Sequence, residues 1–110
     1  MQTDIAIRKM IAHLDRVLAY SAGHDLKSFT ANDMALEASL FNLMQIGELA
    51  AGLSEEFRRS NPEIPWTSVI GLRHRLVHDY EGVNLLLIWD IVSHDLPALR
   101  AQLIAVATGA

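Results

Sequence analysis

Residues 85–106, LLLIWDIVSHDLPALRAQLIAV, carry the most regular apolar pattern in the 110-residue chain. Apolar side chains recur there at helical intervals of three and four, at Leu85, Ile88, Trp89, Val92, Leu96, Leu99, Leu103 and Val106. This spacing places them on one face of a helix. Because Pro97 removes a backbone hydrogen bond but leaves the stripe in phase, we expect a kink or a break into two stacked segments, not a reversal of the chain.

A similar stripe predicts a helix near the start of the chain, from about Thr3 to just before Gly23. After a polar loop over residues 21–28, a longer helix is predicted from about Ala31 to Arg59. Thr30 and Asp33 are arranged as an N-terminal cap for this second helix. Since the second helix is apolar on two faces, we expect it to be central or shared with a second chain.

Two prolines predict a turn over Asn61–Pro65, because proline cannot donate a backbone hydrogen bond and restricts the residue before it. A third helix is predicted over Trp66–Asp79. Trp66 and Trp89 fall on apolar stripes, which favours core packing over base stacking. No segment alternates as a β-strand does, so we expect an all-α fold: an up-and-down bundle of four to five helices in a single domain over residues 1–110.

The composition excludes several classes of protein. Hydrophobic residues make up 51% of the chain and charged residues 20%, which excludes a disordered protein. The absence of cysteine excludes disulfides, thiolate catalysis and sulfur-ligated metals, and it suits a reducing cytoplasm. The first ten residues lack the apolar segment of a signal peptide, and the longest apolar run, Leu85–Trp89, is far shorter than a membrane span. We therefore expect a cytoplasmic protein without a membrane partner.

The charge is unevenly distributed along the chain. The formal net charge of −4 argues against general nucleic-acid binding. Residues 58–78, however, contain four arginines and one acid, a local charge of +3, and the remaining residues sum to −7. The distribution disfavours broad electrostatic capture of RNA but allows a small site directed at one phosphate.

The stretch Gly71–Tyr80, GLRHRLVHDY, concentrates the residues suited to catalysis. They are Arg73, His74, Arg75, His78 and Tyr80. Histidine can both remove and donate a proton near neutral pH, and the arginine fork fits phosphate oxygens. Together they form a minimum set for cleaving a phosphodiester without a metal, since the 2′-hydroxyl of RNA can act as the attacking group.

Arg73 and His78 are five residues apart, which puts them about 140° apart on a straight helix. Two arrangements would bring them together: the helix loosens before Gly82, or two copies of the chain combine. A symmetric dimer with this helix near its two-fold axis would bring both pairs to one cleft. Surplus apolar surface on the second or the last helix supports the dimer.

Other interpretations of these residues remain open. His74, His78 and Glu81 share one helical stripe, as ligands of a metal ion would. The cluster can also be a polar helix end with its cations near the C-terminal dipole. Glu48 lies among apolar neighbours, where it would either pair with Arg73 or Arg75 or occupy a solvated helix edge. We expect no metal and no cofactor.

The arrangement Arg73, four residues, His78, one residue, Tyr80 is an R-x4-H-x-Y motif, and the chain resembles the HepT-like toxins of the HEPN superfamily. The resemblance covers nearly the whole chain, because several stretches resemble family sequences and follow one another in the same order. They are IGELAAGLS, NPEIPW, GLRHRLVHDY, IWDIV and DLPAL. One departure is His74, where many members carry asparagine. It can replace the role of that asparagine, alter the pH profile or mark a weakened enzyme.

The resemblance implies an α-helical homodimer that acts as a metal-independent endoribonuclease on mRNA or tRNA, with Arg73 and His78 as catalytic residues. His74, Arg75 and Glu48 would support them. It further implies a type VII-like toxin–antitoxin system, in which an MntA-like nucleotidyltransferase silences the toxin by adding AMP to Tyr80. Anionic adenylates near His78 would block the cleft and repel RNA. The alternative is a catalytically silent helical module that partners a nucleotidyltransferase.

Overall fold

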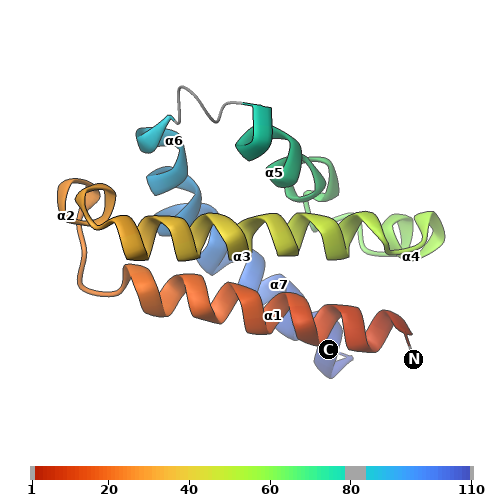
Figure 1. The fold of residues 1–110 in the computed structure, drawn as a ribbon. Coiled ribbons are helices and arrows are strands. Elements are labelled where there is room, and N and C mark those ends of the chain that lie inside the picture. The colour runs from red at the N-terminus through yellow and green to blue at the C-terminus, as the bar shows by residue number, and fades with distance from the viewer. Residues whose placement is uncertain (1, 79–83, 110) are drawn as a thin grey trace.

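The computed structural model describes residues 2–78 and 84–109, except for the side chains of Gln2, Arg73, Leu76, Val77 and His78. Within these ranges the protein is all-helical and contains no strand, as predicted (Figure 1). The elements are α1 (Gln2–Ser21), α2 (Leu26–Ala31), α3 (Asp33–Ala51), α4 (Glu55–Ser60), α5 (Trp66–His78), α6 (Leu85–Asp90), the π-helical segment η2 (Ile91–Asp95) and α7 (Leu96–Thr108). No described helix is both long enough and apolar enough to cross a membrane.

The helix α3 occupies the centre of the fold, which is one of the two roles predicted from its apolar faces. It packs against α1 on one side and α5 on the other, while α7 packs against α1 (Figure 1). Its buried apolar residues, Leu43, Ile46 and Ala50, meet the fully buried Met10, Leu14 and Val17 of α1 in one core. Removing this apolar surface from water is the main source of stability and fixes the platform on which α5 rests.

The prediction of one helix from Ala31 to Arg59 is wrong, because α3 ends at Ala51 and α4 begins at Glu55. Between them, the Ser54 side chain accepts a hydrogen bond from the Phe57 N–H at 3.1 Å and starts the new helix. A serine cap of this kind satisfies a backbone donor that would otherwise have no partner at the helix start. The apolar stripe continues across the break, since Leu53 is buried.

The start of α3 also differs from the prediction. The residues expected to form a polar loop include the start of α2, whose first turn is capped by Asp25. The cap of α3 is Asn32 and not Thr30, because the Asn32 Oδ1 accepts a hydrogen bond from the Ala35 N–H at 2.9 Å. Thr30 instead donates its hydroxyl to the Leu26 carbonyl at 2.7 Å, inside α2.

The last part of the chain continues without a reversal, as predicted, and its adjustment lies just before Pro97. The Leu96 N–H donates to the carbonyl of Ile91, five residues back, so the turn is wider than an α-helical turn. Pro97 then occupies the first turn of α7, where a missing N–H has little cost.

Both tryptophans pack with the core: Trp66 is buried, and the centroid of a Trp89 ring lies 5.3 Å from that of the Phe29 ring.

Candidate functional site

The helix α5 carries the motif and is held against α3 by its apolar face. Val69 and Leu72 are buried on that face. The Trp66 indole donates a hydrogen bond to the Asn61 carbonyl at 3.0 Å, which fixes the entry of the chain into α5. The predicted turn at Asn61–Pro65 therefore sets the position at which the motif helix begins.

The backbone of α5 remains helical through His78, so positions 73 and 78 lie on a regular helix. At about 100° per residue, they project about 140° apart. Position 78 is one turn after both His74 and Arg75, so on a regular helix it projects between these two neighbours. The side chains of Arg73 and His78, and all of Tyr80, lie outside the described residues.

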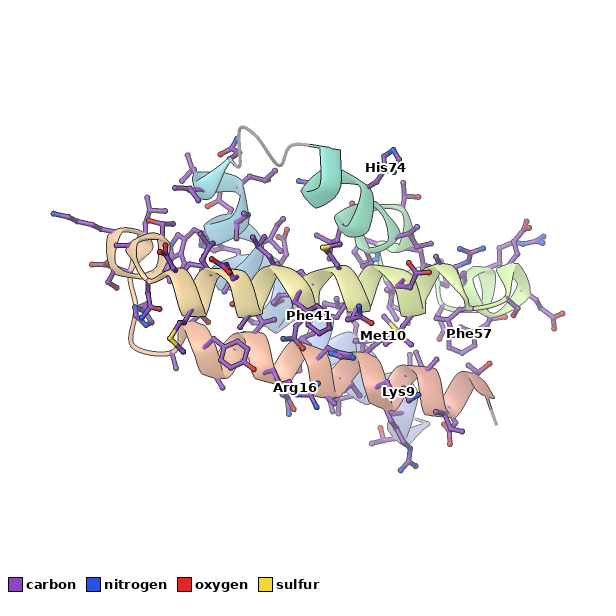
Figure 2. The ribbon with its side chains drawn as sticks, viewed as in Figure 1. Lys9, Met10, Arg16, Phe41, Phe57 and His74 are labelled. Carbon is purple, nitrogen blue, oxygen red and sulfur yellow. The ribbon has the colours of Figure 1, made fainter. Side chains whose placement is uncertain are left out.

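His74 and Arg75 are the polar residues of the stretch Gly71–Tyr80 whose side chains the structure describes, and they face different surroundings. His74 is exposed and points away from α3, on the outer side of α5 (Figure 2). Arg75 is half-buried and lines a pocket between α5 and α7. Arg75 is therefore the motif side chain that faces a concave surface within the described part of the chain.

Glu48 lies on α3, the helix against which α5 packs, and its side chain is exposed. An exposed position fits both interpretations of this residue, a helix edge and a pair with an arginine of the motif helix. The alternative partner Arg73 has a side chain outside the described residues, so a role for Glu48 in supporting the motif stays a prediction.

Among the described residues, no group of three or more histidine and acidic side chains is placed to hold a metal ion. The predicted ligand set of His74, His78 and Glu81 is not covered by this finding, because the His78 side chain and Glu81 lie outside those residues. The metal hypothesis therefore stays a prediction.

Part of the positive charge of residues 58–78 is neutralised by a neighbouring acidic side chain. Arg59 forms an ion pair with Glu55 at 3.0 Å, and both side chains are about three-quarters exposed. Exposed pairs of this kind contribute little to stability, and salt weakens them further. Arg59 thus belongs to a solvated helix end, which leaves α5 as the basic element that also borders a pocket.

The fold and the motif helix together define an all-α protein of HEPN-like architecture, with a basic, histidine-containing helix end as its candidate site. The chain belongs to the HepT-like ribonuclease family, because the family model described as "Ribonuclease HepT-like" matches residues 10–106. The matched region contains the whole R-x4-H-x-Y motif. The resemblance inferred from the sequence is therefore confirmed at the level of the family.

Curated relatives agree with this assignment. A protein of Methanocaldococcus jannaschii named as a candidate RNase is 33% identical over 86 residues, 78% of this chain and 79% of the relative. One from Caldanaerobacter subterraneus subsp. tengcongensis, similarly named, is 32% identical over 80 residues, 73% and 71% of the two chains. A "Probable ribonuclease HepT" from Thermococcus cleftensis is 37% identical over 57 residues, 52% of each chain. No solved structure gives a significant match.

Proposed function

We propose that this chain is a metal-independent endoribonuclease and the toxin half of a type VII-like toxin–antitoxin system, acting in the cytoplasm as one HEPN-like domain over residues 1–110. The observation that carries the proposal is the family match, which includes the complete motif. Relatives named as RNases that align over more than two thirds of this chain support it. The proposed substrate is an RNA, either mRNA or tRNA.

In the proposed reaction, the His78 imidazole takes the proton of a ribose 2′-hydroxyl while the 2′-oxygen attacks the adjacent phosphorus. The bond from phosphorus to the 5′-oxygen then breaks, and an imidazolium donates a proton to the leaving oxygen. Arg73 stabilises the negative charge that develops on the phosphorane. General acid–base catalysis of this kind contributes about 10²–10⁴-fold to a rate, and a cation at the developing charge adds to it.

Positions 73 and 78 lie about 140° apart around α5, which supports the proposal that a second copy completes the site. Apolar side chains are available for such an interface: Leu86 at the start of α6 is 57% exposed, and Met34 and Phe41 on α3 are 84% and 59% exposed. Figure 2 shows Phe41 at the surface of α3. Since α6 follows the motif closely in the chain, an interface that includes Leu86 would bring two motif helices near one another.

Tyr80 is the proposed acceptor of AMP from an MntA-like nucleotidyltransferase. Co-expression with such a partner is expected to raise the intact mass of the protein by whole AMP units, and Tyr80→Phe is expected to abolish the increase. An unchanged mass for the wild type, or an equal increase in Tyr80→Phe, would reject this acceptor. A nucleotidyltransferase reading frame beside the gene would support the pairing.

Analysis of the product ends tests the proposed chemistry. With a chelator present, cleavage of a defined RNA is expected to leave a 2′,3′-cyclic phosphate and a 5′-hydroxyl. The same RNA with a 2′-deoxyribose at the cleavage position should remain intact at that bond. Cleavage that continues at the deoxy position, or that requires added metal, would contradict the proposal and favour the metal hypothesis.

A second candidate is a catalytically silent module that binds a nucleotidyltransferase. The presence of His74 where many family members carry asparagine favours this candidate. It predicts that the purified protein gains AMP but cleaves no RNA, and that His74→Asn restores cleavage. RNA cleavage by the wild type that His78→Ala abolishes would reject it.

A further inference from the structure

A pocket of about 330 Å³ lies between α5 and the helical path formed by η2 and α7. It exists because α5 packs mainly on α3, whereas η2 and α7 pack on α1, so the two helical paths diverge. A hydrogen bond at 2.8 Å from the Gln102 Nε2 of α7 to the carbonyl of Glu63, in the turn before α5, ties the two together at one end of the pocket. Pockets that hold small ligands begin at about this volume.

Three charged side chains line the pocket: Glu63, Arg75 and Asp95. Within residues 2–78 and 84–109, none of them forms an ion pair. Asp95 stands at the junction of η2 and α7, but its carboxylate accepts no capping hydrogen bond from the helix. Helix capping therefore does not account for the acid at this position, and its hydrogen-bonding capacity is available to a ligand.

The lining favours an uncharged planar ligand over a phosphate. Two carboxylates and one guanidinium give the wall a net charge of −1, which repels an anion. The exposed Pro65 and Ala98, with the edges of the buried Leu72 and Leu99, supply apolar surface for a flat ring. A nucleobase has this combination of apolar faces and polar edges.

The pocket is next to the motif. Arg75 lines it, and position 78 follows Arg75 by one helical turn, as an adjacent position on the surface of α5. A base held at Arg75 would thus lie beside the helix end that carries the proposed catalytic histidine. We propose that this pocket binds a guanine base of the RNA, adjacent to the phosphate that is cleaved, an inference that rests on the proposed ribonuclease function.

Guanine matches the polar groups better than the other bases. Its N1–H and N2–H donors are adjacent and fit the two oxygens of one carboxylate, which we assign to Asp95. Its O6 and N7 acceptors are adjacent and fit the arginine fork of Arg75. Adenine would place its N1 lone pair against the carboxylate. Cytosine and uracil each offer the carboxylate one donor group, where guanine offers two.

Direct binding tests the pocket without measuring catalysis. The full chain is titrated separately with GMP, AMP, CMP and UMP at one ionic strength, and backbone amide shifts are followed by NMR. GMP is expected to bind at least tenfold more tightly than the other three, with the shifts concentrated in α5, η2 and α7. Asp95→Asn is expected to weaken GMP binding at least tenfold. Asp90→Asn, the same change at an exposed acid outside the pocket, should leave it unchanged.

Two outcomes would overturn the inference: equal affinity for all four nucleotides, or GMP binding that Asp95→Asn and Asp90→Asn affect alike. Its failure is distinguishable from failure of the proposed function. RNA cleavage without GMP selectivity would reject the guanine pocket and retain the ribonuclease. Selective GMP binding that Asp95→Asn weakens, in a protein that cleaves no RNA, would reject the ribonuclease and retain the guanine site.

Discussion

Asp25 begins α2 with a reciprocal pair of hydrogen bonds. Its Oδ1 accepts from the Ser28 N–H at 2.8 Å, and its own N–H donates to the Ser28 Oγ at 3.0 Å. At the carboxylate, the hydrogen bond from the Ser28 N–H first and that from the Ser28 hydroxyl second hold the pKa of Asp25 below its ordinary value of 3.8. A carboxyl with a lowered folded pKa stabilises the fold above its unfolded pKa and loses that contribution as the pH falls through the folded pKa.

As the pH is lowered from about 5 to below the ordinary pKa of an aspartate, the free energy of unfolding of the wild type is therefore expected to fall more than that of Asp25→Asn. Urea denaturation of both proteins across this range checks the prediction. If the two free-energy curves run parallel, Asp25 does not supply the pH dependence.

Residue types in the motif were sufficient to predict Arg73 and His78 as the candidate site, because few side chains can move protons and bind phosphate, whereas the role of Tyr80 is what the family resemblance implies. Asp95 could not be predicted in the same way. It precedes the buried Leu96, so in the sequence it looks like a solvated residue beside an apolar stripe. Only the divergence of α5 from α7 turns its position into the wall of a pocket.

At the scale of the elements, two glycines that follow helices differ in backbone conformation. Gly52, after α3, has φ −81°, and a Cβ there would meet the Leu49 carbonyl oxygen at 3.5 Å, an ordinary contact. Gly23, after α1, has φ +78°, which side chains rarely adopt. Gly52→Ala is expected to raise the free energy of unfolding by about 0.4–1 kcal/mol, and Gly23→Ala to lower it by about 1 kcal/mol.

Chemical denaturation of both alanine variants measures this difference, and each variant serves as the control for the other. A loss of stability in Gly52→Ala equal to that in Gly23→Ala would show that the break after α3 needs glycine for its backbone. The expected opposite signs would show that the Ser54 cap starts the next helix without that need.

The boundaries of the elements were harder to predict than their existence. Apolar spacing continues from α3 through the buried Leu53, so periodicity alone predicts one helix where the structure has two. The break depends on a local competition, in which the Ser54 hydroxyl caps a new helix start. The π-helical turn before Pro97 is equally invisible to periodicity, because the stripe stays in phase across it.

For the molecule as a whole, the all-α class was predictable because apolar spacing reports directly which faces are buried. The symmetric dimer remains a proposal, and its interface is testable. Leu86→Glu is expected to shift the protein toward monomer, since it places a charge in an apolar contact. Ile5→Glu is the matched control, because Ile5 is 55% exposed, as Leu86 is at 57%, but lies on α1.

Light scattering coupled to size exclusion gives the mass of each variant. The proposed interface predicts that Ile5→Glu keeps the dimeric mass and that Leu86→Glu approaches 12.2 kDa, the mass of one chain. A wild type that is already monomeric would contradict the shared cleft. A Leu86→Glu protein that stays dimeric would place the interface elsewhere.

The rate of RNA cleavage in the presence of a chelator at neutral pH tests the central claim most directly. Purified wild type is compared with Arg73→Ala, with His78→Ala and with His24→Ala, a control histidine in the connection between α1 and α2. The wild type and His24→Ala are expected to cleave at similar rates, and His78→Ala and Arg73→Ala to lose at least about 10²-fold. Cleavage by His78→Ala at the wild-type rate, or no cleavage by the chelated wild type, would contradict the account.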